Sequence, residues 1–465
     1  MSDPLPPAFL VALTEALGTG RVDLSEEALA RAAHDETPHF RSPAPGAVIT
    51  PRNTDEVALV LKEATRAGVY VTPRGAGTGK AGGCVPVQGG VVLSLEHFTE
   101  ILEIDDENFI VRVQPGVLLT DLQQAVEARG LFYPPDPSSL AACTIGGNVA
   151  TNAGGPRAVK YGVTGDYVLG LEVVLPTGEV VRTGRRTAKG VAGYDVTRLM
   201  VGSEGTLGVV TEVTLRLIAR PAAVETALAH FPSSAAAIQC VTKVLRAGLP
   251  LRCAEYVDGR SLDALREHPG VTLRLPAASR AALLFEVDAP SSDEALAALG
   301  AALEQALDEG ALETMVATGE KQRREVWQAR RMLSEATRRW KPRKISEDVV
   351  VPRSRLPELV AQWERLGEEA GFITCAYGHA GDGNLHAQVL FDDESQLARV
   401  EELLKRLFEL TLQLGGTISG EHGIGALKRP YLPLEHSNEL LALQRRLKLA
   451  FDPAGILNPG KILPP

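Results

Sequence analysis

The sequence predicts an α+β protein with more than one domain. The chain has 465 residues, 45% hydrophobic and 23% charged, which is typical of a soluble globular protein of two or three domains. Three glycine-rich blocks in the first half adjoin apolar, strand-like stretches. Residues 222–312 instead alternate strand and helix patterns, with a strand expected over 281–287 and a helix over 292–309. The first half therefore carries the features of a ligand site, and this later region those of a scaffold.

The N-terminal residues 1–40 are expected to form a helical packing segment. Leu10, Leu13 and Leu17 recur at helical spacing, and no residue there suggests chemistry. Beyond them, residues 53–68 have the caps of a helix, and residues 69–73 form a strand-like run. This strand leads directly into the first glycine block.

The first glycine block, Arg74 to Gly79, follows the end of that strand. Closely spaced glycines expose backbone N–H groups that can surround a phosphate. A Rossmann nucleotide fold does not fit, because its third glycine would fall at Lys80. The next element, residues 91–95, is also strand-like rather than the helix that a Rossmann turn would open. By itself this block is as compatible with a plain turn as with a phosphate site.

Two further glycine blocks point to a large ligand. Residues 143–155 contain almost no side chain larger than asparagine, and residues 202–215 again couple glycines to a strand. Glycine weakens helices and strands and buries no surface, so packing alone does not explain these blocks. Close approach of the backbone to an extended, phosphate-bearing ligand explains all three.

Charge and cysteine usage exclude several classes of protein. The formal net charge of -10 and the lack of a basic stripe argue against nucleic-acid binding. Residues 1–17 lack the pattern of a secretory signal, and no apolar run approaches the roughly 20 residues of a spanning helix. The five cysteines are scattered without a Cys-x-x-Cys pair, which argues against a zinc finger, an iron–sulfur cluster or a disulfide framework. We expect a cytoplasmic protein, with peripheral attachment at the inner face of the membrane through partner subunits left open.

A histidine-bearing hairpin is the sequence's candidate metal site. His379 and His386 flank a glycine-rich turn, and the apolar stretches 371–376 and 385–391 on either side are expected strands. A second short run, residues 419–425, offers Glu421 and His422 between glycines. Two imidazoles and one carboxylate suit Zn, Fe, Mn or Co, so His379, His386 and Glu421 are the expected ligands of a divalent metal.

Several of these motifs, in this order, resemble a known flavoprotein family. Residues 73–79, 144–155 and 202–211 resemble the flavin-binding domain of the FAD-linked oxidases, the family of vanillyl-alcohol oxidase and para-cresol methylhydroxylase (PCMH). Residues 378–386, 419–425 and 451–461 resemble the branch with the FAD subunit of bacterial glycolate oxidase, D-lactate dehydrogenase and D-2-hydroxyglutarate dehydrogenase. The resemblance implies a two-lobed, PCMH-type FAD-binding domain over 41–220. It also implies an α+β substrate-capping domain with an antiparallel sheet over 221–420, and a segment over 421–465 that returns to the flavin.

The resemblance implies a set of FAD-binding residues. The first block would hold the pyrophosphate, residues 144–153 would line the isoalloxazine, and residues 204–210 would complete the site. Relatives that tether the flavin do so through a histidine near the first block, and residues 78–82 contain none, so non-covalent FAD is expected. The implied cofactor residues are Pro73, Arg74, Gly75, Ala76, Gly77, Thr78, Gly79, Pro135, Asp136, Ser138, Thr144, Gly146, Gly147, Asn148, Ala150, Thr151, Ala153, Gly154, Tyr161, Gly162, Glu204, Gly205, Leu207, Gly208, Val209, Val210 and Asn458.

A basic helix expected over 320–340 supplies the candidate substrate anchor. Arg323, Trp327, Arg330 and Ser334 share one face of it, and arginine can bind a carboxylate through two parallel hydrogen bonds. The family's substrate-carboxylate arginine matches Arg330, whereas Ser346 stands where the family has a lysine. Further substrate contacts are expected from Arg323, Lys344, Asn384 and Gln388.

These residues together predict FAD-dependent oxidation of a small D-2-hydroxy acid, glycolate or D-lactate, to the 2-oxo acid. Arg330 would hold the carboxylate, and His422 would act as the base, because imidazole titrates near neutral pH. The family implies zinc most often as the metal. Two alternatives stay open: a subunit of a glycolate oxidase complex active only with iron–sulfur and second FAD-like partners, and a flavin-binding subunit without its own catalysis. A homodimer is also compatible with the sequence.

Overall fold

The computed structural model describes residues 4–37, 40, 42–187 and 189–465. The chain divides into two compact units. The first contains residues 1–153, 163–220 and 421–465, and the second contains residues 154–162 and 221–420. Residues 1–3, 38 and 39 of the predicted N-terminal segment, and residue 41, lie outside the described residues. The domain limits expected from the sequence stay a prediction.

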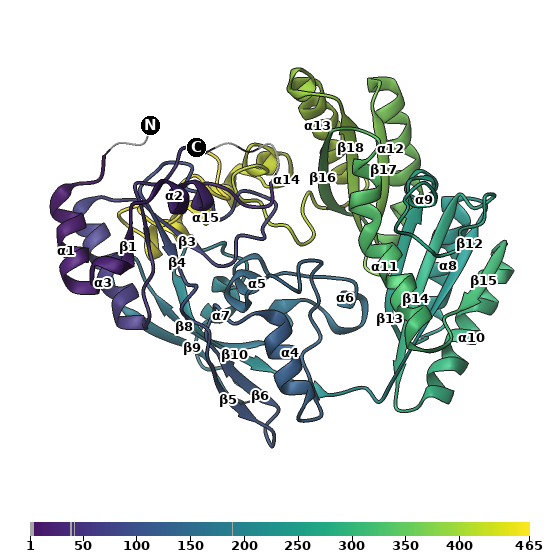
Figure 1. Cartoon of the computed structure of the whole chain (residues 1–465), viewed down its shortest axis with the longest axis horizontal. Helices are drawn as coiled ribbons and strands as arrows, with labels where there is room; N and C mark the ends of the chain where they lie inside the picture. Colours follow the sequence, from purple (N-terminus) through teal and green to yellow (C-terminus); the bar gives the residue numbers. More distant parts are fainter. Residues whose placement is uncertain (1–3, 38–39, 41, 188) are drawn as a thin grey trace. The chain divides into compact units, whose positions relative to one another are not determined.

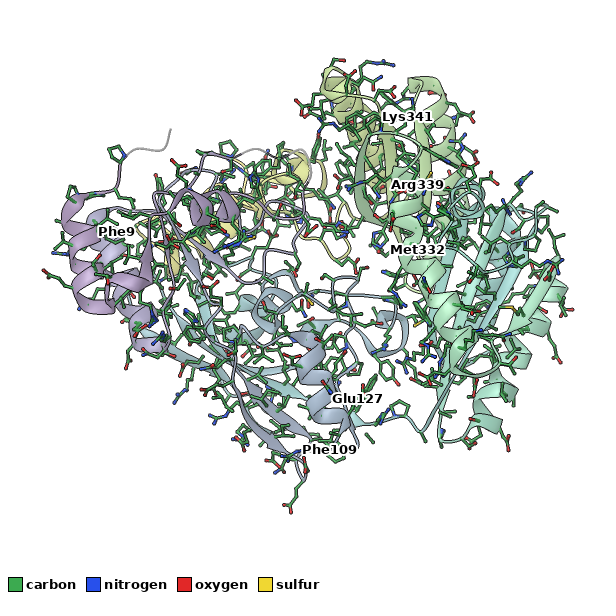
Figure 2. All side chains as sticks on the ribbon, in the orientation of Figure 1. Phe9, Phe109, Glu127, Met332, Arg339 and Lys341 are labelled. Carbon is green, nitrogen blue, oxygen red and sulfur yellow. The ribbon has the colours of Figure 1, made fainter. Side chains whose placement is uncertain are left out.

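The first unit begins with a small mixed sheet of order β1-β2-β4-β3. Its strands are β1 (Val22–Asp23), β2 (Ala47–Ile49), β4 (Val91–Ser94) and β3 (Val71–Arg74), with β2, β4 and β3 parallel. Helices α1 (Pro7–Leu17) and α3 (Thr54–Ala67) cover it and bury an apolar core that includes Phe9, labelled in Figure 2. The predicted helix over 53–68 is confirmed: Asn53 caps its N-terminus by accepting from the Glu56 N–H, and Gly68 ends it at φ 65°.

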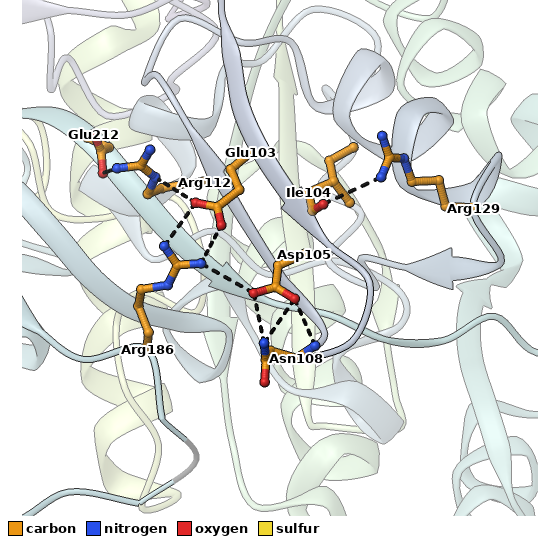
Figure 3. A network of polar contacts seen from close by, with 8 residues as sticks. All are labelled: Glu103, Ile104, Asp105, Asn108, Arg112, Arg129, Arg186 and Glu212. Carbon is orange, nitrogen blue, oxygen red and sulfur yellow. Dashed lines mark hydrogen bonds and ion pairs between the residues drawn. The ribbon is translucent and has the colours of Figure 1, made fainter.

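The second sheet of this unit is antiparallel, with the order β5-β6-β10-β8-β9. Its strands are β5 (Ile101–Asp105), β6 (Ile110–Val113), β10 (Val209–Arg216), β8 (Val168–Val174) and β9 (Val180–Gly184). Figure 3 shows charged side chains crossing its outer strands: Arg112 lies 3.3 Å from Glu103 and 3.2 Å from Glu212, and Arg186 donates to both Glu103 and Asp105. These side chains are at least partly exposed, so solvent screens the pairs and each adds little to the stability of the sheet.

The C-terminal part of the first unit returns to its first sheet. Helix α15 (Asn438–Phe451) is followed by a segment in which Leu457 forms a parallel bridge with Val71 of β3. The Val71 N–H donates to the Ile456 carbonyl at 2.9 Å, and the Asn458 N–H donates to the Val71 carbonyl at 2.7 Å. The end of the chain therefore lies beside the strand that leads into the first glycine block.

The second unit is built on a seven-stranded antiparallel sheet of order β15-β12-β14-β13-β17-β18-β16. The strands are β12 (Ala223–Phe231), β13 (Leu251–Asp258), β14 (Ala281–Ala289), β15 (Glu313–Val316), β16 (Arg343–Val350), β17 (Ile373–His379) and β18 (Asn384–Phe391). Helices α8 (Ser234–Arg246), α10 (Ser292–Asp308), α12 (Leu356–Ala370) and α13 (Leu397–Gln413) pack against one face (Figure 1).

The opposite face of this sheet holds α9 (Gly259–Arg266) and α11 (Gly319–Arg338). Helix α11 is the predicted basic helix, and Figure 2 labels Met332 on it and its C-cap, Arg339. Its apolar residues pack on Val257 and Tyr377, while its polar residues bond to the strands. In the part of the chain that the structure describes, no helix is both long enough and apolar enough to span a membrane.

The histidine hairpin has the predicted form. Strands β17 and β18 are antiparallel neighbours, with Tyr377 opposite His386 and His379 opposite Asn384. The turn between them depends on glycine, because Gly383 has φ 90° and a Cβ there would lie 2.2 Å from the Val351 carbonyl oxygen. The sheet therefore orients His379, Asn384 and His386 toward the same face, since paired and i+2 residues share a face.

Candidate functional site

The three glycine blocks come together in the first unit. The Gly202 N–H donates to the Val149 carbonyl at 2.9 Å, and the Glu204 N–H to the Ala150 carbonyl at 2.8 Å, which joins the third block to the second. The first block approaches the second so closely that a Cβ on Gly75 would lie 2.6 Å from Thr144 Oγ1. A side chain is thus excluded at Gly75, where the first block meets the second.

Asn458 ties these blocks to the C-terminal segment. Its Nδ2 donates to the Gly83 carbonyl at 2.9 Å and to the Glu204 carbonyl at 2.7 Å. It is buried and has φ 44°, a left-handed conformation that asparagine tolerates better than most residues. One amide group therefore fixes the distance between the first block, the third block and the returning chain.

Glu204 connects the third block to the loop that carries His422. Its two carboxylate oxygens accept from the Ile424 and Gly425 N–H groups, each at 2.8 Å. Burial raises the pKa of this carboxyl to about 7, although the two N–H donors and the nearby Lys461 oppose the rise. Burial also lowers the pKa of Lys461 to about 8. The loop after His422 is consequently held by a group that titrates near neutral pH.

These residues fit a flavin nucleotide. Thr144 Oγ1 and Asn458 Oδ1 are buried and have no hydrogen-bond partner within the described protein, so a ligand rich in polar groups would satisfy them. Gly75 and Gly77 are only partly buried, and Gly77 has φ 76°. The buried Lys461 adds positive charge in the same unit, which suits a pyrophosphate.

The predicted cofactor residues divide between the two units. Asn458 and the predicted residues of the three blocks other than Gly154 lie in the first unit, as do Pro135, Asp136 and Ser138 in the loop before α5 (Ile145–Thr151). Gly154, Tyr161 and Gly162 belong to the second unit, where the Tyr161 hydroxyl donates to Asp288 Oδ2 at 2.7 Å. Lys160 also pairs with Asp288, so this short segment is anchored to β14.

In the second unit, the two predicted histidine ligands lie close together. Their ring centroids are 5.3 Å apart and the rings are nearly perpendicular, at 85°. Both rings are buried. Asn384 of β18 pairs with His379 across the hairpin, and its buried Oδ1 has no hydrogen-bond partner among the described residues. Two imidazoles and an amide oxygen are groups that can bind a divalent metal or a polar substrate.

Glu255 of β13 is a residue of this cluster that the sequence analysis did not identify. It is fully buried, and Oε1 lies 2.5 Å from His379 Nδ1 while Oε2 accepts from Arg330 Nε at 2.7 Å. Burial pushes the pKa of this carboxyl upward, but the charges of His379 and Arg330 outweigh burial and hold the pKa below its ordinary value. The only signal in the sequence is that an otherwise apolar strand carries Arg252, Glu255 and Asp258.

Helix α11 connects the predicted substrate residues to the sheet. Arg323 donates to the Val224 carbonyl, Arg330 pairs with Glu255, and Ser334 accepts from Lys344 Nζ at 2.6 Å. Gln388 of β18 accepts from Thr337 at 2.9 Å and donates to the Tyr377 hydroxyl at 2.7 Å. Arg323, Lys344 and Gln388 therefore all make bonds that hold α11 against the sheet.

Glu421 and His422 begin the last stretch of the first unit. His422 Nε2 lies 3.9 Å from Glu421 Oε1. The preceding residue, Gly420, ends the second unit, and its N–H donates to Asp348 Oδ2 at 2.7 Å. A Cβ on Gly420 would lie 2.2 Å from Asn384 Nδ2, so the chain just before Glu421 runs tightly against the histidine hairpin. Asp348 is a second residue of this region that the sequence analysis did not identify.

Comparison with known proteins decides the family. The family model described as "FAD binding domain" matches residues 45–184, and the model described as "FAD linked oxidases, C-terminal domain" matches residues 220–462. The glycolate oxidase subunit GlcD of Bacillus subtilis is 43% identical over 433 residues, which cover 92% of this chain and 91% of that protein. The chain belongs to the FAD-linked oxidase family.

Further relatives agree with this assignment. A D-lactate dehydrogenase of Anaerostipes hadrus is 38% identical over 449 residues, covering 95% of this oxidase and 94% of that protein. The solved structure of p-cresol methylhydroxylase with substrate bound has the same fold, with a TM-score of 0.80 and 16% identity over 100% of this chain and 99% of that one. The predicted family and the α+β, PCMH-type fold are confirmed. This chain is an FAD-linked oxidoreductase of the glycolate oxidase subunit and D-lactate dehydrogenase type.

The Glu204 carboxyl gives this oxidase a specific dependence of stability on pH. Because its pKa is raised from 4.5 to about 7 in the folded state, its contribution to stability is fully present below pH 4.5 and is lost as the pH rises through 7. Thermal unfolding of the wild type and Glu204→Gln between pH 5 and 8 should show the wild type losing up to about 3 kcal/mol relative to the variant. A difference that does not change with pH would contradict this.

Proposed function

We propose that this FAD-linked oxidase converts a small D-2-hydroxy acid, glycolate or D-lactate, to the corresponding 2-oxo acid. The observation that carries the proposal is the arrangement around Glu255, whose two oxygens hold His379 and Arg330. An imidazole suited to a metal and a guanidinium suited to a carboxylate thus lie on one face of one sheet. A 2-hydroxy acid carries the two matching groups, a hydroxyl and a carboxylate, on adjacent carbons.

Arg330 is the proposed anchor of the substrate carboxylate. Its guanidinium lies over the Tyr377 ring, 4.9 Å from the ring centroid, and is mostly buried, which favours a fixed orientation. Asn384, with its buried and unbonded Oδ1, is the best-supported additional substrate contact. We assign Arg323, Lys344 and Gln388 mainly to holding α11 against the sheet, because each already bonds within the second unit.

His379, His386 and Glu421 are the proposed ligands of a divalent metal. The two imidazoles are close neighbours on the hairpin. The N–H of Gly420, the residue before Glu421, donates to Asp348 of β16, which fixes the chain at this point. Zinc is our first choice and Mn, Fe or Co are alternatives, because two nitrogens and one carboxylate suit all four. A metal bound there would supply Lewis-acid polarisation of the substrate hydroxyl.

His422 is the proposed base that removes the hydroxyl proton. It adjoins the ligand Glu421, and Glu204 fixes the loop behind it through Ile424 and Gly425. FAD, when bound, supplies the acceptor at N5 for the hydride that leaves C2. We propose that the flavin is held without a covalent bond, because residues 78–82 contain no histidine. Flavin that stayed on the protein after acid precipitation would contradict this.

A second candidate function is that of a subunit that works only within a glycolate oxidase complex. The similarity to the GlcD subunit favours it. Electrons would then pass to iron–sulfur and second FAD-like partners. The isolated chain would still reduce its own flavin with the 2-hydroxy acid, but would reduce an external dye slowly until the partners were added. A flavin-binding subunit without catalysis would reduce neither.

Replacing Glu421 tests the metal site. Glu421→Ala should contain less than one equivalent of metal by elemental analysis after mild dialysis, because one of three protein ligands is lost. Glu439→Ala, at an exposed position on α15 of the same unit, is the matched control and should keep the wild-type metal content. A Glu421→Ala protein with full metal content would remove Glu421 from the ligand set.

Replacing His422 tests the proposed base. His422→Ala should retain FAD and metal but lose turnover of glycolate and D-lactate by ~10²-fold or more, the usual contribution of a general base. His436→Ala, in the same unit at the end of α14 (Leu432–Glu435), serves as the control and should turn over like the wild type. Near-normal kcat in His422→Ala would exclude this residue as the base.

A further inference from the structure

We propose that Glu255 is a positioning residue that sets both the metal-binding imidazole and the substrate-binding guanidinium, and so couples the two. This inference rests on the proposed function, because it concerns how that site is held. Glu255 is the one carboxylate in the described part of the chain that bonds to both a predicted metal ligand and the predicted substrate anchor.

Both carboxylate oxygens of Glu255 are engaged by these two partners. Glu255 lies on β13 directly opposite His379 of β17 and is fully buried. Oε1 faces His379 Nδ1 at 2.5 Å, and Oε2 receives Arg330 Nε at 2.7 Å and Arg330 Nη2 at 2.5 Å. Each oxygen therefore serves one partner, and a shift of the carboxylate moves both partners together.

For His379, this contact selects the ring nitrogen that faces a metal. A proton on Nδ1 is held by Glu255, which leaves Nε2 as the nitrogen with a lone pair to donate. A carboxylate behind a histidine ligand also fixes the ring plane and raises its basicity as a ligand. Loss of such a contact weakens metal affinity by ~10–100-fold.

For Arg330, the same contact selects the edge of the guanidinium that remains for substrate. The group has five N–H donors, and Glu255 takes the Nε donor and one Nη2 donor. The two Nη1 donors and the second Nη2 donor remain, and one N–H from each of these two nitrogens matches a carboxylate in a bidentate arrangement. The Tyr377 ring, 4.9 Å away, restricts rotation of the group out of this orientation.

The neighbouring strand offers a matched control. Glu286 of β14 is also buried and also accepts from α11, through Trp327 Nε1 at 2.7 Å. Its other partners are Thr226 at 3.0 Å, Arg252 at 3.1 Å and the Cys253 thiol at 3.9 Å, none of which is a histidine. Glu286→Gln therefore perturbs the same helix–sheet contact without touching His379 or Arg330.

The experiment compares metal-depleted wild type, Glu255→Gln and Glu286→Gln in a zinc titration against a competing chelator. We expect Glu255→Gln to bind zinc at least about tenfold more weakly than the wild type, with Glu286→Gln unchanged. After zinc saturation, the KM of Glu255→Gln for D-lactate should rise about tenfold. The neutral amide replaces the charged acceptor of Arg330, so one charge-assisted hydrogen bond that orients the guanidinium is lost. If Glu255 had only a structural role, both variants would be less stable than the wild type, and all three proteins would bind zinc with the same affinity.

A measurement on the unaltered protein covers the case in which Glu255→Gln does not fold. Long-range ¹⁵N–¹H spectra of the metal-free wild type should show the His379 ring protonated at Nδ1, and a ring protonated only at Nε2 would overturn the inference. A wild type that binds no zinc would overturn the proposed metal site together with this inference. Equal zinc affinity of wild type and Glu255→Gln would overturn the inference alone.

Discussion

A buried carboxylate needs compensation, and this requirement organises the second unit around Glu255. Removing an isolated charge from water costs several kcal/mol, so a fully buried glutamate remains ionised only between donors. His379 and Arg330 supply those donors from β17 and α11. The fold therefore pairs the candidate metal ligand with the candidate substrate anchor as a condition of its own stability. Stability and the proposed chemistry thus depend on the same three side chains.

In the first unit, hydrogen bonds to backbone groups, rather than ion pairs, hold the loops of the candidate site in place. Its glycine blocks have few large side chains, and hydrogen bonds among loops join the blocks to one another. Asn458 and Glu204 provide these bonds, one through its amide and the other through its carboxylate. Glu204 also holds the loop that follows His422. The parts expected to contact the flavin and the proposed base are thus fixed by one connected set of polar contacts.

Local features of the fold were predictable from the sequence. The helix over 53–68 has recognisable capping residues at both ends, and the hairpin through His379 and His386 has glycines at its turn. Both depend on residues a few positions apart. The ordered motifs also sufficed to indicate the family and its PCMH-type fold, which the relatives confirm. The roles of the individual site residues stay predictions.

Contacts between distant segments could not be predicted, because they leave no pattern in the amino-acid sequence. Glu255 and His379 are 124 residues apart, and Glu204 and Ile424 are 220 apart, so neither pairing follows from spacing. Tyr161 likewise reaches Asp288 across 127 positions, which groups residues 154–162 with the second unit. In each case one buried polar group required a partner, and only the folded chain supplies it.

We propose that Arg330, the histidine pair and His422 direct hydride loss from C2 of a 2-hydroxy acid. Anaerobic stopped-flow bleaching of the bound flavin, with D-lactate carrying hydrogen or deuterium at C2, tests this most directly. The account predicts that the flavin bleaches in a single turnover and that deuterium slows the bleaching phase. Flavin that stays oxidised with both D-lactate and glycolate, or that bleaches at the same rate with both isotopes, would contradict it.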